Sequence, residues 1–412
     1  MRGTSTTMAT STTTTLGMRT DRSRLKKILL NRRLSKCSPQ ETLQQGVLTL
    51  SEMTNNSALH TQDSLLEIPE ANEEQLFNAL FDTMLKKTKG VYWKPSVKAY
   101  CLNGVRNIAK LVNEISLDKF HSTTPHPVEI YYPKRRTVLA TTFKERVYQG
   151  LINDLIYPYM TKSFIYANTA SQKGKGTDKA RELVKKYLWN FYCNHSLNGY
   201  VLQIDIHSYY QSIPLDKALS LFEEKLPYHL YLRVKEVLDT QYPYTFYAGS
   251  QMVQILGVSY LDKLDHFIKE KLHIKYYIRY QDDLLIIYHD KDYLSFCLER
   301  IKLEIEELGL TLNLEKTHIK PISKSFYFLG FFYTLNSNGS IYMKANPKSV
   351  KHERYILKKC YKKKSYNKLR EQLESYLSHI RKGNSRHLET RLIIYARSLY
   401  ANIDTQRSTA RN

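Results

Sequence analysis

Two apolar stretches flank a short polar centre between residues 275 and 288. The chain there runs Tyr-Tyr-Ile-Arg-Tyr, then Gln281, Asp282 and Asp283, then Leu-Leu-Ile-Ile-Tyr. Aromatic and β-branched runs separated by a tight polar segment are typical of a β-hairpin. We therefore expect a hairpin whose tip carries two adjacent carboxylates.

A second apolar strand, residues 200–206, ends in one acid, Asp205. Burying acids among apolar strands is costly unless a cation neutralises them. Hard oxygen donors with no nearby His or Cys cluster favour Mg²⁺ over zinc. A strand-end Asp with a hairpin Asp282-Asp283 is the ligand set that two Mg²⁺ ions need for in-line phosphoryl transfer in polymerases. Taken alone, the Asp-Asp pair is equally an ordinary polar turn.

Helical periodicity covers much of the remaining chain after residue 72. We expect helices beginning near residue 177, over residues 258–271 and 293–308, and a last pair over 369–379 and 386–400. Two short extended segments within residues 128–139 are joined by a basic turn containing Lys134 and Arg136. Residues 1–70 are polar, with a Ser/Thr-rich start and then basic residues, so we predict a disordered extension there. Its composition also resembles an organellar transit peptide.

Charge indicates a polyanionic partner. Lys and Arg exceed Asp and Glu by 62 − 39 = 23, which favours nucleic acid first and an anionic membrane surface second. No apolar run approaches the length of a membrane span, so we expect no insertion into a bilayer. The five cysteines are odd in number, scattered and form no Cys-x-x-Cys pair, which argues against a disulfide framework or a zinc site. We therefore expect a reducing, cytoplasmic location.

Two basic segments are candidates for contact with a phosphate backbone. Between residues 344 and 370 there are eleven Lys/Arg residues and one acid, Glu353, a steeper bias than an ordinary solvated helix face. The Gly/Lys run over 172–176 opens a helix, whose free N–H groups suit phosphate. The basic candidates are Lys173, Lys175, Lys358, Lys359, Lys362 and Lys363.

Taken in this order, the segments resemble a bacterial reverse transcriptase over roughly residues 75–400. The resemblance implies that Asp205, Ile206, Asp282 and Asp283 form a site for two Mg²⁺ ions, and that the three aspartates are catalytic. It also implies that Tyr210 excludes ribonucleotides by steric contact with the sugar. Packing of Tyr209 or Tyr210 in the turn before the next helix is the alternative that the residues themselves leave open.

The resemblance extends to the groups around the acids. Gly249 and Gln254 match the second palm motif at the nucleotide, and Lys316 matches the lysine that protonates pyrophosphate. The finger residues that hold the triphosphate correspond to Lys134 and Arg136. The primer grip corresponds to Phe328, Leu329 and Gly330.

The implied fold is α+β, a right-hand polymerase with a small antiparallel palm sheet and a helical thumb. We expect fingers over residues 72–198, a palm over 199–335 and a basic thumb over 345–405. The implied partners are an RNA template, a DNA or RNA primer, dNTPs and a specific non-coding RNA.

The subfamily is less sharply marked. The Gly/Lys run and the segment 264–268 resemble both diversity-generating retroelement enzymes and the abortive-infection and defence-associated group. Val253 before Gln254 departs from the Ser-Gln of retroelement enzymes, so we favour bacterial anti-phage defence. Template-independent or protein-primed synthesis, an RNA-dependent RNA polymerase, and an RNA-binding scaffold on a polymerase fold are the alternatives.

Overall fold

The computed structural model describes residues 73–131, 135–241 and 245–409. It divides into two compact units, the first ending at Phe120 and the second beginning at His121. This boundary falls inside the range 72–198 that the sequence predicts as fingers. The extension predicted for residues 1–70 and the candidate residue Lys134 lie outside the described residues.

The described part of the first unit is helical. It consists of α2 (Glu73–Thr88), α3 (Pro95–Leu102) and α4 (Gly104–Ser116). In α2, Leu76, Leu80 and Met84 recur at four-residue spacing and are buried, so one face of the helix packs inward. Proline opens α3, where its missing N–H leaves no hydrogen bond unmade.

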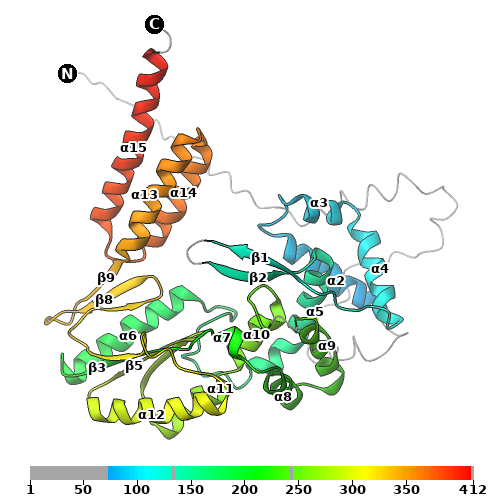
Figure 1. Ribbon diagram of the computed structural model, residues 1–412, viewed down its shortest axis with the longest axis horizontal. Coiled ribbons are helices and arrows are strands. Elements are labelled where there is room, and N and C mark those ends of the chain that lie inside the picture. The colour runs from blue at the N-terminus through cyan, green and yellow to red at the C-terminus, as the bar shows by residue number, and fades with distance from the viewer. Residues whose placement is uncertain (1–72, 132–134, 242–244, 410–412) are drawn as a thin grey trace, which may run out of the picture. The chain divides into compact units, whose positions relative to one another are not determined.

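A four-stranded antiparallel sheet forms the centre of the second unit (Figure 1). Its strand order is β4 (Tyr276–Tyr280), β5 (Asp283–Tyr288), β3 (Tyr200–Asp205), β6 (His318–Pro321). The strands β3, β4 and β5 are mostly apolar, and most of their side chains are buried. In Figure 1, α6 (Thr177–His195) lies over one face and α12 (Lys291–Glu307) runs along the other.

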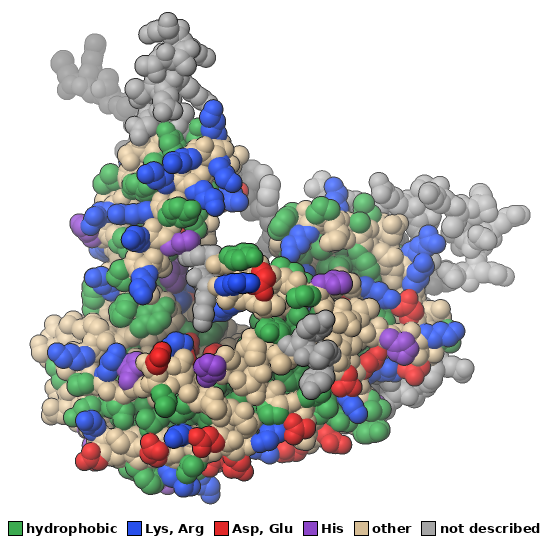
Figure 2. Space-filling model, in the orientation of Figure 1, with side chains coloured by type: hydrophobic (Ala, Val, Ile, Leu, Met, Phe, Trp, Pro, Cys, Tyr) green, Lys and Arg blue, Asp and Glu red, His purple; other side chains and the backbone are tan. Residues whose placement is uncertain are grey.

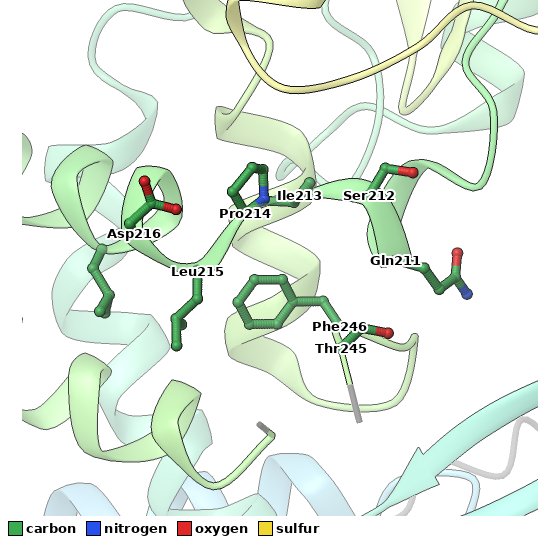
Figure 3. A pocket seen from close by; sticks show the side chains of 9 residues that line it. Gln211, Ser212, Ile213, Pro214, Leu215, Asp216, Thr245 and Phe246 are labelled. Atoms are coloured by element: carbon green, nitrogen blue, oxygen red, sulfur yellow. The ribbon is translucent and has the colours of Figure 1, made fainter. Parts of the chain in front are cut away.

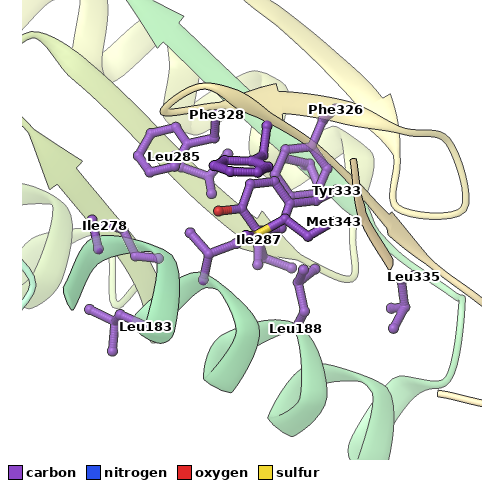
Figure 4. Close-up of a cluster of buried hydrophobic side chains, with 14 of the residues drawn as sticks. Leu183, Leu188, Ile278, Leu285, Ile287, Phe326, Phe328, Tyr333, Leu335 and Met343 are labelled. Carbon is purple, nitrogen blue, oxygen red and sulfur yellow. The ribbon is translucent and has the colours of Figure 1, made fainter. Parts of the chain in front are cut away.

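One hydrophobic cluster joins α6 and this sheet to a second, three-stranded sheet (Figure 4). The second sheet is β7 (Phe326–Phe328), β8 (Phe331–Leu335) and β9 (Ile341–Ala345). Leu183 and Leu188 of α6, Leu285 of β5 and Tyr333 of β8 meet in the cluster. Close-packed cores resist deformation, so the strand ends that carry the acids are attached to a rigid part of the protein.

The basic hairpin and the helices beside the sheet complete this region. The hairpin is β1 (His126–Ile130) and β2 (Arg136–Ala140), as predicted. The helices are α5 (Phe143–Thr161), α7 (Tyr209–Ser212), α8 (Leu215–Lys225), α9 (Tyr228–Asp239), α10 (Gln251–Ser259), α11 (Asp262–His266) and a π-helix (Phe267–Lys271).

The single helix predicted over residues 258–271 is wrong in detail. The chain there forms the end of α10, then α11, then a π-helical turn. The Val258 carbonyl at the end of α10 accepts a hydrogen bond from the buried Arg279 guanidinium, 3.0 Å away, and Asp265 pairs with the same group. These tertiary contacts accompany the break, and hydrophobic periodicity does not report them.

Three helices end the described chain: α13 (Pro347–Lys362), α14 (Tyr366–Ile380) and α15 (Arg386–Thr409). Leu357, Cys360, Leu369 and Leu399 form their shared core. Within the described ranges, no helix is long and apolar enough to cross a bilayer.

Candidate active site

The three predicted acids lie at one end of the four-stranded sheet. Asp205 is the last residue of β3 and Asp283 the first of β5, and the antiparallel register sets them opposite each other. Tyr280 pairs with Asp283, so Gln281 and Asp282 form the tight turn of the predicted hairpin. Gln281 has a left-handed φ of 57°. The hairpin is confirmed by this register, while metal binding by the acids stays a prediction.

Burial and neighbouring carboxylates raise the pKa values of Asp282 and Asp283. Burial, then the charges of Asp282 and Asp205, raise the pKa of Asp283 to about 7. Burial also raises the pKa of Asp282, with the Asp205 charge adding to the effect, while Arg136 and Lys316 oppose it. The charged forms of Asp282 and Asp283 are therefore disfavoured until a cation binds.

A divalent cation fits the chemistry of this donor set. It would offset the mutual repulsion of the carboxylates, and carboxylate oxygens are the ligands that Mg²⁺ prefers. The Ile206 side chain is buried and apolar, so only its backbone carbonyl could join the set. Among the residues that the structure describes, no three His, Cys, Asp or Glu side chains are gathered closely enough to hold an ion as they stand.

Lys316 lies beside the first acid, in the turn that precedes β6. Its Nζ donates to Asp205 Oδ2 at 2.9 Å, and its side chain is 61% exposed. The turn is tied to β3, because Asn313 N–H donates to the Asp205 carbonyl at 2.8 Å and Thr317 Oγ1 accepts from Asp205 N–H at 3.3 Å. The turn thus places an exposed ammonium at the acids.

Tyr210 also points toward the catalytic turn. Its hydroxyl donates to Gln281 Oε1 at 3.2 Å, and burial raises its pKa to about 12, so the hydroxyl stays protonated. A Cβ at Gly257 would overlap the Tyr210 ring, which shows that the ring lies directly on α10. Its neighbour Tyr209 is the packing residue, since it is buried and donates to the Gly257 carbonyl at 2.7 Å.

Of the second-motif residues, only Gln254 points toward this site. Its Nε2 donates to Ser171 Oγ at 3.0 Å. Gly249 has a φ of 142°, and a Cβ there would collide with the Leu139 carbonyl of β2. The sequence predicts that Gly249 allows a ligand to approach the backbone closely. In the structure β2 makes that approach, so the glycine joins the hairpin to the start of α10.

The basic hairpin lies near the acids through β2. Arg136 is exposed, and its charge lowers the pKa of Asp282, so the guanidinium is within electrostatic reach of the turn. The predicted partner Lys134 falls in the part of the hairpin that is not described.

The predicted primer-grip segment is the turn between β7 and β8. Phe328 is buried in the core, while Leu329 and Gly330 have left-handed φ values of 45° and 92°. Arg181 of α6 donates to the Leu329 carbonyl from NH2 at 2.9 Å and from Nε at 3.3 Å. Gly330 packs against His379 of α14, so the turn is held between α6 and α14.

The two lysines of the Gly/Lys run behave differently. The Lys175 ammonium donates to the carbonyls of Tyr166 (3.1 Å) and Asn168 (2.9 Å), and burial lowers its pKa. The predicted phosphate contact of Lys175 is not supported, because its ammonium already donates to these two backbone carbonyls. Lys173 is exposed, with its Nζ 5.4 Å from the centre of the Tyr157 ring.

The four predicted lysines, three near the end of α13 and one directly after it, are exposed, and Figure 2 shows many more Lys and Arg than Asp and Glu side chains over α13–α15. Glu353, the acid in this stretch, is buried, and one of its oxygens accepts from Gln372 at 3.0 Å. The solvent face of α13 is thus more basic than its composition indicates. The lysines are Lys358, Lys359, Lys362 and Lys363.

A buried ion pair under the hairpin is not among the residues predicted from the sequence. Arg279 of β4 and Asp265 of α11 both have side chains with no exposed surface. Arg279 donates to both Asp265 oxygens, at 2.7 and 2.6 Å, and to the Gln281 carbonyl at 3.1 Å. The sequence signal for this pair is an arginine inside an otherwise apolar strand, since a buried arginine needs an acidic partner.

A pocket of about 620 Å³ lies where the end of α7 leads into α8 (Figure 3). Ile213, Pro214, Leu219 and Phe246 give it an apolar lining, with Asp216 at one side. It contains none of the predicted site residues.

Residues 132–333 match the family model described as Reverse transcriptase (RNA-dependent DNA polymerase). No curated protein is detectably similar to the sequence. Among solved structures, telomerase from Candida albicans in complex with a TWJ fragment of telomeric RNA has a TM-score of 0.40 and 12% identity, covering 84% of this chain and 78% of that one. Apo telomerase from Candida tropicalis, truncated from its C-terminal domain, has a TM-score of 0.40 and 10% identity, covering 77% and 86%. Neither a substrate nor a partner follows from similarity at this level.

The matched segment contains the acid cluster, Lys316 and the turn between β7 and β8. Its mixture of helices and small antiparallel sheets is the α+β fold that the sequence predicts. The chain carries a reverse transcriptase domain over residues 132–333 and is an RNA-directed DNA polymerase, a nucleotidyltransferase.

Proposed function

We propose that this domain adds dNTPs to a primer 3′-hydroxyl along an RNA template, with two Mg²⁺ ions held by Asp205, Asp282 and Asp283. The observation that carries the proposal is that Asp205 at the end of β3 lies opposite Asp283 at the start of β5, with Asp282 in the turn directly before it. Burial and neighbouring carboxylates raise the pKa values of Asp282 and Asp283, and a divalent cation would stabilise their charged forms. Bound Mg²⁺ would stabilise the charge on the α-phosphate and on the departing pyrophosphate.

The surrounding side chains supply the other requirements of the reaction. Lys316 can protonate the leaving pyrophosphate, since its ammonium is exposed and already lies at the acids. Arg136 presents a guanidinium suited to the triphosphate. Tyr210 and Gln254 would contact the incoming nucleotide. The turn at Leu329 would hold the primer end.

The exposed face of α13 would follow the phosphate backbone of the template–primer duplex. Lys173, which is exposed in the loop before α6, is a further proposed phosphate contact.

The test is incorporation of labelled dNTP by purified full-length protein on a primed RNA template with Mg²⁺. Asp205→Asn and Asp282→Asn should each abolish extension, while Asp239→Asn, at an exposed position at the end of α9, should leave it intact. Binding of the same RNA should be nearly unchanged in all three variants. Wild-type activity in Asp205→Asn would refute the mechanism.

The resemblance of the motifs also supports a proposed role in bacterial anti-phage defence, with a specific non-coding RNA as template. A retroelement enzyme and a template-independent or protein-primed polymerase share the same motifs. Labelling reactions without added template distinguish these roles. Label attached covalently to the protein would indicate protein priming, and sequencing of copurified RNA would identify a dedicated template.

A further inference from the structure

Ser171 joins two glutamines that approach it from different elements. It lies in the loop before α6, and its Oγ accepts from Gln254 Nε2 of α10 and from Gln281 Nε2 of the catalytic turn, both at 3.0 Å. A hydroxyl oxygen has two lone pairs, so these two contacts use its full acceptor capacity. Ser171 thereby sets the direction in which both amide groups point.

The direction of the Gln281 amide determines what Tyr210 can do. Because the Gln281 nitrogen donates to Ser171, the carbonyl oxygen of the same amide faces Tyr210 and accepts a hydrogen bond from its hydroxyl, with 3.2 Å between the two oxygens. The hydroxyl end of the Tyr210 ring also packs against Gly257, where an added Cβ would lie 2.5 Å from a ring carbon. The ring is therefore held by a hydrogen bond and by close packing.

The loop that carries Ser171 is anchored to the sheet that carries the acids. Thr169 N–H donates to the Arg279 carbonyl of β4 at 3.0 Å, and Asn168 forms a β-bridge with Arg279. Gln172 Nε2 in turn donates to the Asn168 carbonyl at 2.7 Å. Ser171 is thus fixed relative to the catalytic turn, although its own side chain is exposed.

We propose that Ser171 is a positioning residue for sugar selection, which holds the Tyr210 ring against the site of the nucleotide sugar by way of Gln281. This inference rests on the proposed function and on the proposed role of Tyr210 in excluding a 2′-hydroxyl. It adds a residue from the loop before α6 to the determinants of specificity.

Loss of the Ser171 hydroxyl should loosen the ring without unfolding the protein. Both glutamine amides lose an acceptor and can rotate, so the Gln281 oxygen no longer stays at the Tyr210 hydroxyl. The loss of one ordinary hydrogen bond corresponds to a roughly 2- to 10-fold change in the ratio of kcat/KM for rNTP to kcat/KM for dNTP, in favour of rNTP.

The variants Ser171→Ala and Ser171→Gly separate the hydroxyl from the backbone. Ser171 has a φ of 51°, which glycine adopts readily and alanine does not. Because both variants lack Oγ, an equal gain in ribonucleotide use assigns the effect to the hydroxyl. Gain in only one variant would assign it to the backbone and overturn the proposal. Ser295→Ala is the matched control, since that exposed hydroxyl bonds only within α12.

The experiment measures single-nucleotide extension of a primed RNA template with matched dNTP and rNTP, together with thermal melting of each variant. We expect unchanged melting, the selectivity change above in both Ser171 variants, and no further change when Ser171→Ala is added to Tyr210→Val. Altered selectivity in Tyr210→Val with none in Ser171→Ala would overturn this inference alone. Absence of any incorporation by wild-type protein would overturn the proposed function, and this inference with it.

Discussion

The buried pair of Arg279 and Asp265 predicts a large loss of stability on neutralisation of the acid. Asp265 accepts from Arg279 Nε at 2.7 Å, from Arg279 NH2 at 2.6 Å and from the Tyr277 hydroxyl at 2.6 Å. Neither charged side chain has exposed surface. Asp265→Asn keeps the shape, removes the charge and turns one acceptor into a donor, which leaves the guanidinium uncompensated.

The expected magnitude is set by burial. Removing one member of a buried pair costs about 3–5 kcal/mol, because the remaining charge is far from water. An exposed pair contributes at most about 1 kcal/mol. Glu224→Gln is therefore a suitable control, since it breaks the pair between Lys263 and Glu224, in which both side chains are more than half exposed. Replacing both buried residues, as Asp265→Leu with Arg279→Met, should recover much of the loss.

The assay is chemical denaturation followed by tryptophan fluorescence in a Trp93→Phe background. That change leaves Trp189 of α6 as the one tryptophan in the sequence, and α6 packs on the strand that carries Arg279. A loss below about 1 kcal/mol in Asp265→Asn, similar to that in Glu224→Gln, would refute the reasoning. So would a double variant as unstable as the sum of its single changes.

Three further predictions follow from the same structure. In EDTA, the unfolding free energy should fall as pH rises from about 4 to about 7, because folded Asp283, with a pKa of about 7, keeps a proton that the unfolded chain releases near 3.8. Melting curves of Asp283→Asn should show a flatter dependence, and parallel curves would contradict this. Gly249→Ala should destabilise the protein by about 1–3 kcal/mol or more, since it adds a backbone collision to the strain of a positive φ. Gly174→Ala, which has a positive φ and open space, should cost less, and an equal loss would exclude the collision. Replacing Lys358 and Lys359 with Ala should reduce the slope of log affinity for RNA against log salt by roughly 0.7–0.9 per lost phosphate contact, measured by fluorescence anisotropy, whereas an unchanged slope would place the RNA elsewhere.

Local pattern was sufficient for the strands that carry the acids. The apolar runs around Gln281 and Asp282 specified a hairpin, and the structure has it in the expected register. The start of α6 at Thr177 was likewise predictable from the glycines before it. These features depend on side chains and turns within a few residues of one another.

Two predicted contacts find other partners in the fold. The predicted phosphate ligand Lys175 donates to the carbonyls of Tyr166 and Asn168, nine and seven residues before it. The close approach expected at Gly249 is made by β2, more than a hundred residues earlier in the chain. At both positions the residue type correctly indicated a close contact, but the sequence did not show which group makes that contact.

The sequence by itself determined the class of the protein, because the motifs of acids, glycines and aromatic residues can be recognised from residue type and order alone. It also determined the hairpin that presents Asp282 and Asp283. Only the tertiary structure decided what surrounds that hairpin: Asp205 opposite Asp283, Arg279 clamped by Asp265, and Ser171 linked through Gln281 to Tyr210. Hydrogen bonds and charge pairs act over a few ångströms. They join residues far apart in sequence only after the strands and helices have packed.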